Sequence, residues 1–273
     1  MEKGKIIVIE GTDCSGKETQ SKKLIENLNK KGIRTGYFSF PNYKSPSGKI
    51  VGLPYLGKPY LAEELVNSHT DEVKRRLKEK FQDSYNENLV NQAFSILAEE
   101  MGIGWFPEGA PNVDPRCASG LYAIDRLYNL PAINEILETG ENLVIDRYMY
   151  SNMAHQGGKK HDEQERQSFY EWDQKLEMEM FGLPESDIRI FLHMPTEYSA
   201  FLKKGRSEAL DEHERDTEHL LNAEKAYLEI ASRFDFTTVE CIKNRSNSIS
   251  EVDIKTPEEI SKEVFDIVAR KLA

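Results

Sequence analysis

Seven residues near the start of the chain, 11–17, have the types and spacing of a phosphate-binding loop. They read Gly-Thr-Asp-Cys-Ser-Gly-Lys, so Gly11, Gly16 and Lys17 fit the pattern G-x-x-x-x-G-K. In this pattern the glycines let the backbone wrap around phosphate oxygens, and backbone N–H groups at a helix N-terminus face the anion. The lysine adds a positive charge near the transferred phosphoryl group. These residues, called the P-loop below, predict binding of ATP.

The P-loop departs from the common pattern at the position after the lysine. That position usually carries a Ser or Thr hydroxyl that touches Mg²⁺, but here it is Glu18, with Thr19 next. Asp13 is a candidate for holding metal-bound water or an acceptor hydroxyl, or is a turn-forming residue. The residues expected to contact ATP are Gly11, Thr12, Asp13, Cys14, Ser15, Gly16, Lys17, Glu18 and Thr19.

A second candidate site follows the apolar run 143–145, where Asp146 and Arg147 occur in succession. A carboxylate at the carboxyl end of a buried strand faces the crevice in which α/β proteins bind ligands. Asp146 is therefore the candidate residue for orienting Mg²⁺ opposite the P-loop. A surface Asp-Arg pair is the alternative interpretation.

Five short apolar runs rich in β-branched residues alternate with helical patterns, and this alternation indicates how the candidates are positioned. The runs are 6–9, 37–40, 143–145, 188–192 and 237–242. They predict an α/β protein with the three-layer P-loop NTPase fold, in which a five-stranded parallel sheet carries helices on both faces. A helix is expected over 16–31, and another begins after Thr256 with a capping box.

The charged stretch between Leu61 and Met101 interrupts this alternation. Leu77, Phe81, Tyr85 and Leu89 recur every four residues, which is an amphipathic helix pattern, and a loop rich in Gly and Pro follows over 102–115. We expect one domain, 1–273, with a helical insertion at about 58–112.

The composition excludes several classes of partner. A formal charge of -11 disfavours nucleic acid and anionic membranes, and the chain has no run of about 18 apolar residues that would span a bilayer. The three cysteines are widely spaced and contain no C-x-x-C pair, which favours a reducing compartment. The apolar run after the first lysines is too short for a signal peptide. We therefore expect a cytoplasmic protein.

Four segments in succession resemble the motifs of thymidylate kinases. They are EGTDCSGKETQ (10–20), Phe40-Pro41, YAIDR (122–126) and DRYMYSNMAHQ (146–156), and the similarity covers most of the chain apart from about 57–112. The resemblance implies a homodimeric enzyme of deoxynucleotide biosynthesis that phosphorylates dTMP to dTDP with Mg²⁺ and ATP.

The same resemblance assigns roles to individual residues. Asp13 contacts the acceptor sugar or its metal, Phe40 and Tyr122 frame the thymine, Arg126 hydrogen-bonds and stacks on the base, and Arg147 holds the acceptor phosphate. An aromatic ring with a guanidinium plane suits a base, and a guanidinium fork matches phosphate. Phe40 and Tyr122 as core aromatics, and Arg126 as an exposed residue paired with Asp125, are the alternatives. Further residues that line the acceptor pocket in the family correspond to Ser151, Asn152, His155 and Gln156.

A polar, basic stretch at about 196–216 resembles the lid that closes on ATP in the family. The P-loop has no arginine, so a lid arginine is expected to neutralise charge during transfer, Arg206 first and then Arg215. Lys17, Asp13, Arg147 and Arg206 are thus the expected catalytic residues. Two alternatives stay open: a kinase of another deoxynucleotide or of a deoxynucleoside, and an ATP-binding regulatory module without transfer activity.

Overall fold

The computed structural model describes residues 3–203, 217–246 and 248–273. The chain divides into two compact units. Unit 1 consists of Met1–Pro41 and Pro115–Ala273, and unit 2 of Asn42–Asp114. The insertion expected at about 58–112 falls within unit 2, which begins earlier in the chain, at Asn42.

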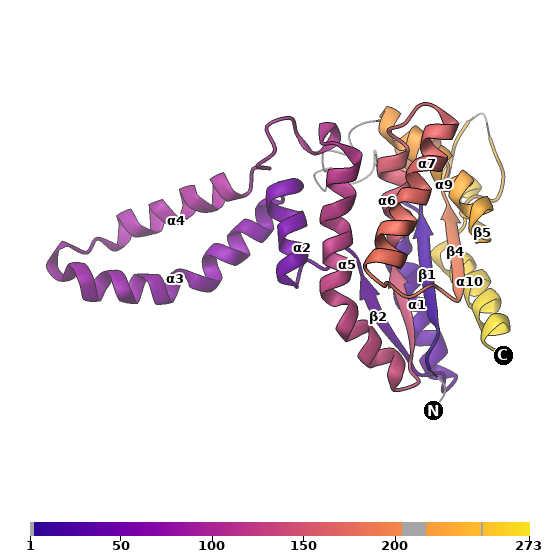
Figure 1. The fold of residues 1–273 in the computed structure, drawn as a ribbon, viewed down its shortest axis with the longest axis horizontal. Helices are drawn as coiled ribbons and strands as arrows, with labels where there is room; N and C mark the ends of the chain where they lie inside the picture. The colour runs from indigo at the N-terminus through magenta and orange to yellow at the C-terminus, as the bar shows by residue number, and fades with distance from the viewer. Residues whose placement is uncertain (1–2, 204–216, 247) are drawn as a thin grey trace. The chain divides into compact units, whose positions relative to one another are not determined.

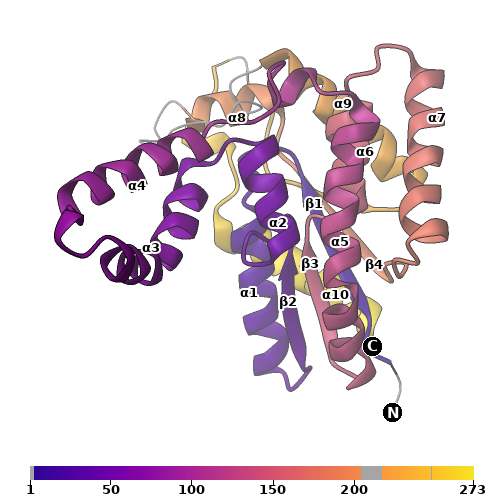
Figure 2. The same ribbon diagram turned by 60° about the vertical axis from the view of Figure 1, so that its left-hand side comes forward.

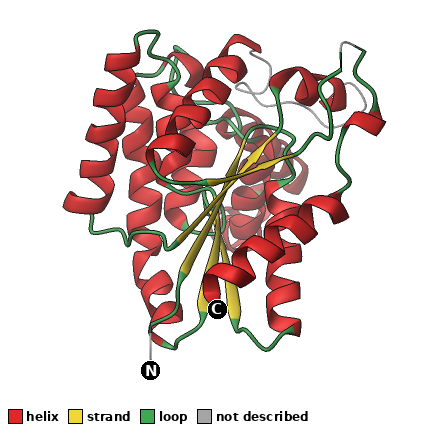
Figure 3. Ribbon diagram, turned by 90° about the vertical axis from the view of Figure 1, so that its right-hand side faces the viewer, coloured by secondary structure: helices red, strands yellow, loops and turns green. Residues whose placement is uncertain are grey.

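Unit 1 is built on a parallel sheet of five strands in the order β2-β3-β1-β4-β5. Each expected apolar run forms one strand, and helices lie between successive strands (Figures 1 and 3), so the predicted α/β fold is confirmed. The strands are β1 (Ile6–Gly11), β2 (Thr35–Ser39), β3 (Asn142–Asp146), β4 (Ile188–His193) and β5 (Thr237–Glu240).

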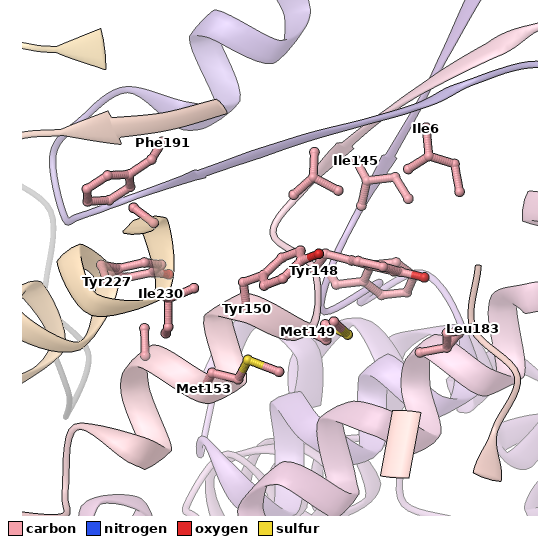
Figure 4. Packing of buried hydrophobic residues seen from close by; sticks show 14 of the residues in the cluster. Ile6, Ile145, Tyr148, Met149, Tyr150, Met153, Leu183, Phe191, Tyr227 and Ile230 are labelled. Atoms are coloured by element: carbon pink, nitrogen blue, oxygen red, sulfur yellow. The ribbon is translucent and has the colours of Figure 1, made fainter. Parts of the chain in front are cut away.

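Both faces of the sheet are buried, which explains why β1 is apolar along its length. Ile6 and Val8 pack with residues of four helices on one face, which are α5 (Pro115–Glu138), α6 (Met149–Gly157), α7 (Glu163–Gln174) and α9 (Thr217–Arg233). Ile7 and Ile9 pack with residues of three helices on the other, which are α1 (Lys17–Lys30), α8 (Thr196–Lys203) and α10 (Pro257–Leu272). Figure 4 shows the first cluster, in which Tyr148 and Met149 lie below Ile145 and Met153 lies below Tyr150.

Two helices of unit 1 begin where the sequence predicts a helix start. Lys17 opens α1, with Gly16 at φ 77° before it, and the capping box at Thr256 and Glu259 is present. The segments are α1 (Lys17–Lys30), α5 (Pro115–Glu138), α6 (Met149–Gly157), α7 (Glu163–Gln174), the π-helical η4 (Lys175–Met180), α8 (Thr196–Lys203), α9 (Thr217–Arg233), the 3₁₀ turn η5 (Glu251–Asp253) and α10 (Pro257–Leu272). In Figures 1 and 2, α5 and α6 lie side by side.

Unit 2 contains two longer helices, α3 (Pro59–Phe81) and α4 (Glu87–Met101), which pack on each other. The shorter segments are α2 (Pro46–Ile50), η1 (Val51–Tyr55), η2 (Gln82–Ser84) and η3 (Ala110–Asn112). The four-residue repeat from Leu77 to Leu89 therefore does not form one helix. Gln82 has a φ of 40°, and the Asn86 side chain accepts a hydrogen bond from Leu89 N and starts α4. In the described residues, no helix has the length and hydropathy needed to cross a membrane.

Candidate active site

The P-loop follows β1 and encloses the buried ammonium group of Lys17. Lys17 Nζ donates to the carbonyl oxygens of Gly11 at 2.9 Å and Thr12 at 3.0 Å. Burial, and then the charge of Arg147, lower the pKa of Lys17 to about 8. Gly11 has to be a glycine, because a Cβ there would lie 2.5 Å from Ser15 Oγ and 2.7 Å from Leu192 O. The loop therefore holds Lys17 under backbone groups that suit phosphate.

Thr12 fastens the P-loop to the end of β4. Its Oγ1 donates to Met194 O at 2.6 Å and accepts from Met194 N at 2.8 Å. Beneath the loop, the Cys241 thiol contacts Ser15 O at 3.8 Å. Cys14 is half-buried in the loop and has a φ of 58°. These contacts fix the backbone on which phosphate N–H contacts depend.

Glu18 and Thr19 are exposed on the first turn of α1. Glu18 pairs with Lys22 on the outside of the helix, and its side chain is 68% exposed. The carboxylate that replaces the usual hydroxyl therefore forms a surface ion pair, and it does not occupy the inside of the loop.

Asp146 ends β3 and has the features of a metal ligand. Burial raises its pKa, although Lys17 and Arg147 oppose the rise. Tyr37 OH donates to Asp146 Oδ2 at 3.4 Å, whereas Oδ1 is buried and makes no hydrogen bond to the described residues. Such an oxygen suits Mg²⁺, which takes one or two carboxylates and completes its shell with water and phosphate oxygens. Among the described residues, no group of three or more Asp, Glu, His or Cys side chains could hold a metal ion by itself. A metal at Asp146 would therefore need water and phosphate oxygens as its other ligands.

Asp13 is a second acidic group in the P-loop. Burial alone would raise its pKa, but the charges of Lys17 and Arg147 hold that pKa well below its usual range. Its Oδ2 pairs with Lys203 Nζ at 3.0 Å, and both side chains are nearly buried. Asp13 is therefore an ionised acceptor at the mouth of the loop.

Arg147 follows Asp146 in a left-handed backbone conformation, with a φ of 65°. Its backbone N–H donates to Ile9 O at 3.1 Å, and the charge of its guanidinium acts on Lys17 and Asp13 of the P-loop. Burial opposes its charge, but Tyr227 and Asp13 raise its pKa above the usual range. Arg147 Nη1 lies 3.4 Å from Nε2 of His155, whose ring stacks on His219 with centroids 5.6 Å apart. Arg147 thus brings a permanent positive charge to the carboxyl ends of β1 and β3.

Arg126 and Phe40, two residues expected to bind the base, lie next to each other. The Arg126 guanidinium carbon lies 5.9 Å from the Phe40 ring centroid. Arg126 is 2% exposed and pairs with Glu177, and Asp125 accepts from Asn129, so the interpretation of Arg126 as an exposed partner of Asp125 is wrong. Phe40 is buried and also packs on Phe38 and Tyr148.

The other expected acceptor residues divide into two groups. Tyr122 lies half-buried on α5 one turn before Arg126, while Asn152 and Gln156 are buried on α6. Asn152 Nδ2 donates to Glu177 Oε1 at 3.1 Å. Ser151 instead directs its hydroxyl to Glu10 Oε2 at 2.6 Å. We call Phe40, Tyr122, Arg126, Asn152 and Gln156 the candidate base site.

A sequence model of the thymidylate kinase family matches residues 108–253, which is more than half of the 273 residues. The chain belongs to the thymidylate kinase family.

The human thymidylate kinase is 25% identical to the chain over 192 residues, which are 70% of this chain but 62% of the human protein. The chain thus spans less than two thirds of that relative. The thymidylate kinase of Mycobacterium tuberculosis (strain H37Rv) is 23% identical over 84% of this chain and 86% of its own length. A solved structure of the thymidylate kinase of Candida albicans superposes with a TM-score of 0.59 at 19% identity, covering 98% of this chain and 92% of that one, which shows the shared fold.

In this member of the thymidylate kinase family, Glu10 is a buried residue for which the sequence predicted no role. It is fully buried at the end of β1, and burial raises its pKa. Its carboxylate accepts hydrogen bonds from Tyr148 N at 2.7 Å, Ser151 N at 3.1 Å and Tyr227 OH at 3.2 Å. Glu10 therefore fixes the turn that carries Arg147. The sequence signal that could have identified Glu10 is its position, because it is an acidic residue directly after the apolar run 6–9.

His193 is another buried group without a sequence-based assignment, at the end of β4. Its Nδ1 lies 2.9 Å from Glu240 on β5, and its Nε2 lies 2.9 Å from Glu224 on α9. Glu224 also accepts from Thr196 N at 2.9 Å, at the start of α8. This His193 network therefore connects four elements around the start of the expected lid.

The lid expected at about 196–216 begins with α8, which ends at Lys203. Arg206 and Arg215, the expected catalytic arginines of the lid, lie outside the described residues. Their assignment stays a prediction.

Proposed function

We propose that this chain transfers the terminal phosphoryl group of ATP to dTMP in a direct in-line reaction that yields dTDP and ADP. The pairing of the Arg126 guanidinium with the Phe40 ring supports this proposal most directly, because Phe40 lies at the carboxyl ends of the strands, which Lys17 and Arg147 also follow. It supplies a surface for a planar base next to cations for two phosphate groups.

Each cation has one task in this proposal. The P-loop amides and Lys17 bind the phosphates of ATP, and Arg147 holds the acceptor phosphate in a forked contact. Asp146, through its unpaired Oδ1, would hold Mg²⁺, which supplies neutralisation of phosphate charge when bound. Asp13 accepts a hydrogen bond from the acceptor sugar. Catalysis then comes from positioning and electrostatic stabilisation.

The lid has two tasks in the same proposal. Closure over ATP excludes water that would otherwise accept the phosphoryl group. Arg206, or Arg215 in its place, supplies a guanidinium charge, because the P-loop contains Lys17 but no arginine. Family resemblance further supports a homodimer in the cytoplasm, and light scattering of the purified protein tests the dimer.

A panel of phosphoryl acceptors tests the proposal. The protein is incubated with Mg²⁺, ATP and, in turn, thymidine, dTMP, dUMP, dCMP, dAMP and dGMP, while ADP formation is followed. We expect turnover to be fastest with dTMP. A different preferred acceptor would reassign the base site, and ATP binding without turnover on any acceptor would favour a regulatory module.

A further inference from the structure

Glu177 lies in η4, outside every segment that the sequence singled out, and it is fully buried against Arg126. Arg126 Nε donates to Oε2 of Glu177, and Nη2 donates to Oε1 at 2.6 Å. Two parallel hydrogen bonds between a planar guanidinium and a planar carboxylate fix both the position and the plane of the guanidinium. Glu177 therefore orients Arg126.

The fork leaves one end of Arg126 available. In the described part of the chain, the hydrogen bonds of Arg126 use Nε and Nη2, so Nη1 keeps its N–H groups for another acceptor. The guanidinium carbon lies 5.9 Å from the ring centroid of Phe40. A base that stacks at this ring would meet a donor whose direction is set by Glu177.

Glu177 is itself held from α6. Asn152 Nδ2 donates to Glu177 Oε1 at 3.1 Å and to Ser119 O at 3.2 Å. Asn152 is a member of the candidate base site, so one buried carboxylate connects two of its residues, which come from α5 and α6. A substitution of Glu177 should therefore alter the positions of Arg126 and Asn152, which both donate hydrogen bonds to it.

Asp173 on α7 is a second acidic residue near Arg126, but its negative charge is disfavoured. Burial, and then the charge of Glu177, raise the pKa of Asp173 well above its usual range, which favours the neutral acid. Asn152 and Ser119 oppose that rise, but neither oxygen of Asp173 makes a hydrogen bond to the described residues. Arg126 is thus balanced by one carboxylate, that of Glu177.

We propose that Glu177 is a positioning residue that sets the base selectivity of the acceptor site by aiming Arg126 Nη1 at a carbonyl oxygen on the pyrimidine. The 4-keto oxygen of a pyrimidine such as thymine accepts this hydrogen bond. Cytosine has a 4-amino group at the same position, and its N–H groups would face the N–H groups of Arg126 Nη1, so that both sets of donors stay unpaired. The inference rests on the proposed transfer to a pyrimidine monophosphate. It extends that function by naming a residue that selects keto over amino bases.

The substitution Glu177→Gln tests this inference, with Asp173→Asn as the matched control. Glu177→Gln should raise the KM for dTMP by about 10- to 100-fold, the usual effect of losing a charge-assisted hydrogen bond. The KM for ATP and kcat should stay within about threefold, and the ratio of kcat/KM for dTMP over dCMP should fall. Asp173→Asn is equally buried but not bonded to Arg126, so it should leave these values unchanged.

A double-mutant cycle separates positioning from a general structural effect. If Glu177 acts through Arg126, then Glu177→Gln should have no further effect on KM or selectivity once Arg126→Met is present. Independent, multiplicative effects of the two changes would overturn the inference. Removing one partner of a buried ion pair often destabilises a protein, so circular dichroism accompanies each variant. Glu177→Asp keeps the charge and should restore part of the selectivity if Glu177→Gln does not fold.

The same assays distinguish the two proposals. If the unmodified protein transfers to no pyrimidine monophosphate, the proposed function fails, and the inference fails with it. If the unmodified protein phosphorylates dTMP and folded Glu177→Gln retains both its KM and its preference over dCMP, the inference alone is overturned.

Discussion

Lys17, Asp146 and Arg147 place one ammonium, one carboxylate and one guanidinium around the P-loop, and their pKa shifts report how strongly they interact. The charge of Arg147 lowers the pKa of Lys17, while Lys17 and Arg147 oppose the rise in the pKa of Asp146. The two buried cations repel each other, and the carboxylates of Asp13 and Asp146 oppose that repulsion. Phosphate groups of two nucleotides would relieve that repulsion.

The two cations should therefore be indispensable for turnover. Lys17→Ala and Arg147→Ala should each lower kcat/KM by about 100-fold or more, because Lys17 binds the phosphates of ATP and Arg147 holds the acceptor phosphate. The matched control is Lys22→Ala, since Lys22 lies one turn along α1 and pairs on the surface with Glu18. Near-normal rates in either folded variant would refute the assignment.

Cys14 should report occupancy of the P-loop. Alkylation adds bulk inside the loop, so labelled protein should no longer bind ATP, and bound ATP should slow the labelling. Cys117 is exposed and Cys241 is buried, so a Cys117→Ser background directs a thiol reagent to Cys14. Full activity after stoichiometric labelling, verified by mass spectrometry, would reject a role for this position.

The residues of this site were predictable from sequence to different degrees. The P-loop is local in sequence, so spacing alone predicted where Lys17 would lie. Glu10 and Glu177 were missed because their roles depend on partners far along the chain: Glu10 bonds Tyr148 across 138 residues and Glu177 bonds Arg126 across 51. No periodicity in one sequence encodes such pairs.

At the scale of elements, β4, β5, α8 and α9 are coupled through the His193 network. Burial works against a positive charge on His193, but its hydrogen bonds to Glu224 and Glu240 raise its pKa above the usual value. Glu224 also receives the N–H of Thr196, where α8 begins. The charge of His193 therefore contributes to anchoring the first helix of the expected lid.

The His193 network should make stability depend on pH. Because the folded-state pKa of His193 is raised, its contribution is fully present below about pH 6.5, the unfolded value, and is lost as pH rises through the folded pKa. Urea unfolding from pH 6 to 9 measures this against His193→Gln. The difference in free energy of unfolding between the two proteins should shrink as pH rises. A difference that stays constant or grows with pH would contradict a charged His193.

The sequence predicted the types of the elements, but it did not predict that the helical pattern in unit 2 is divided into α3 and α4. All five strands arose at the apolar runs. Burial on both faces explains this for the central strands β1, β3 and β4, whereas the edge strands β2 and β5 are partly exposed and depend on pairing with a buried neighbour. The division between α3 and α4 was missed because the repeat from Leu77 to Leu89 continues through it. Neither Gly nor Pro marks the break, which depends on the Asn86 cap and on the backbone of Gln82.

At the scale of the whole molecule, a net charge of -11 contrasts with a local group of cations at one end of the sheet. The long-range field of such a chain repels polyanions, while a small, deeply bound phosphate responds to the nearest charges. This separation is consistent with substrates that are single nucleotides.

The balance of products tests the central claim most directly. The protein is incubated with Mg²⁺, ATP and dTMP, and ADP and dTDP are quantified together by chromatography. Direct transfer with water excluded predicts one dTDP for each ADP, and negligible ADP when dTMP is omitted. ADP that accumulates without an equal amount of dTDP would contradict the account, because it would show that water, and not dTMP, accepts the phosphoryl group.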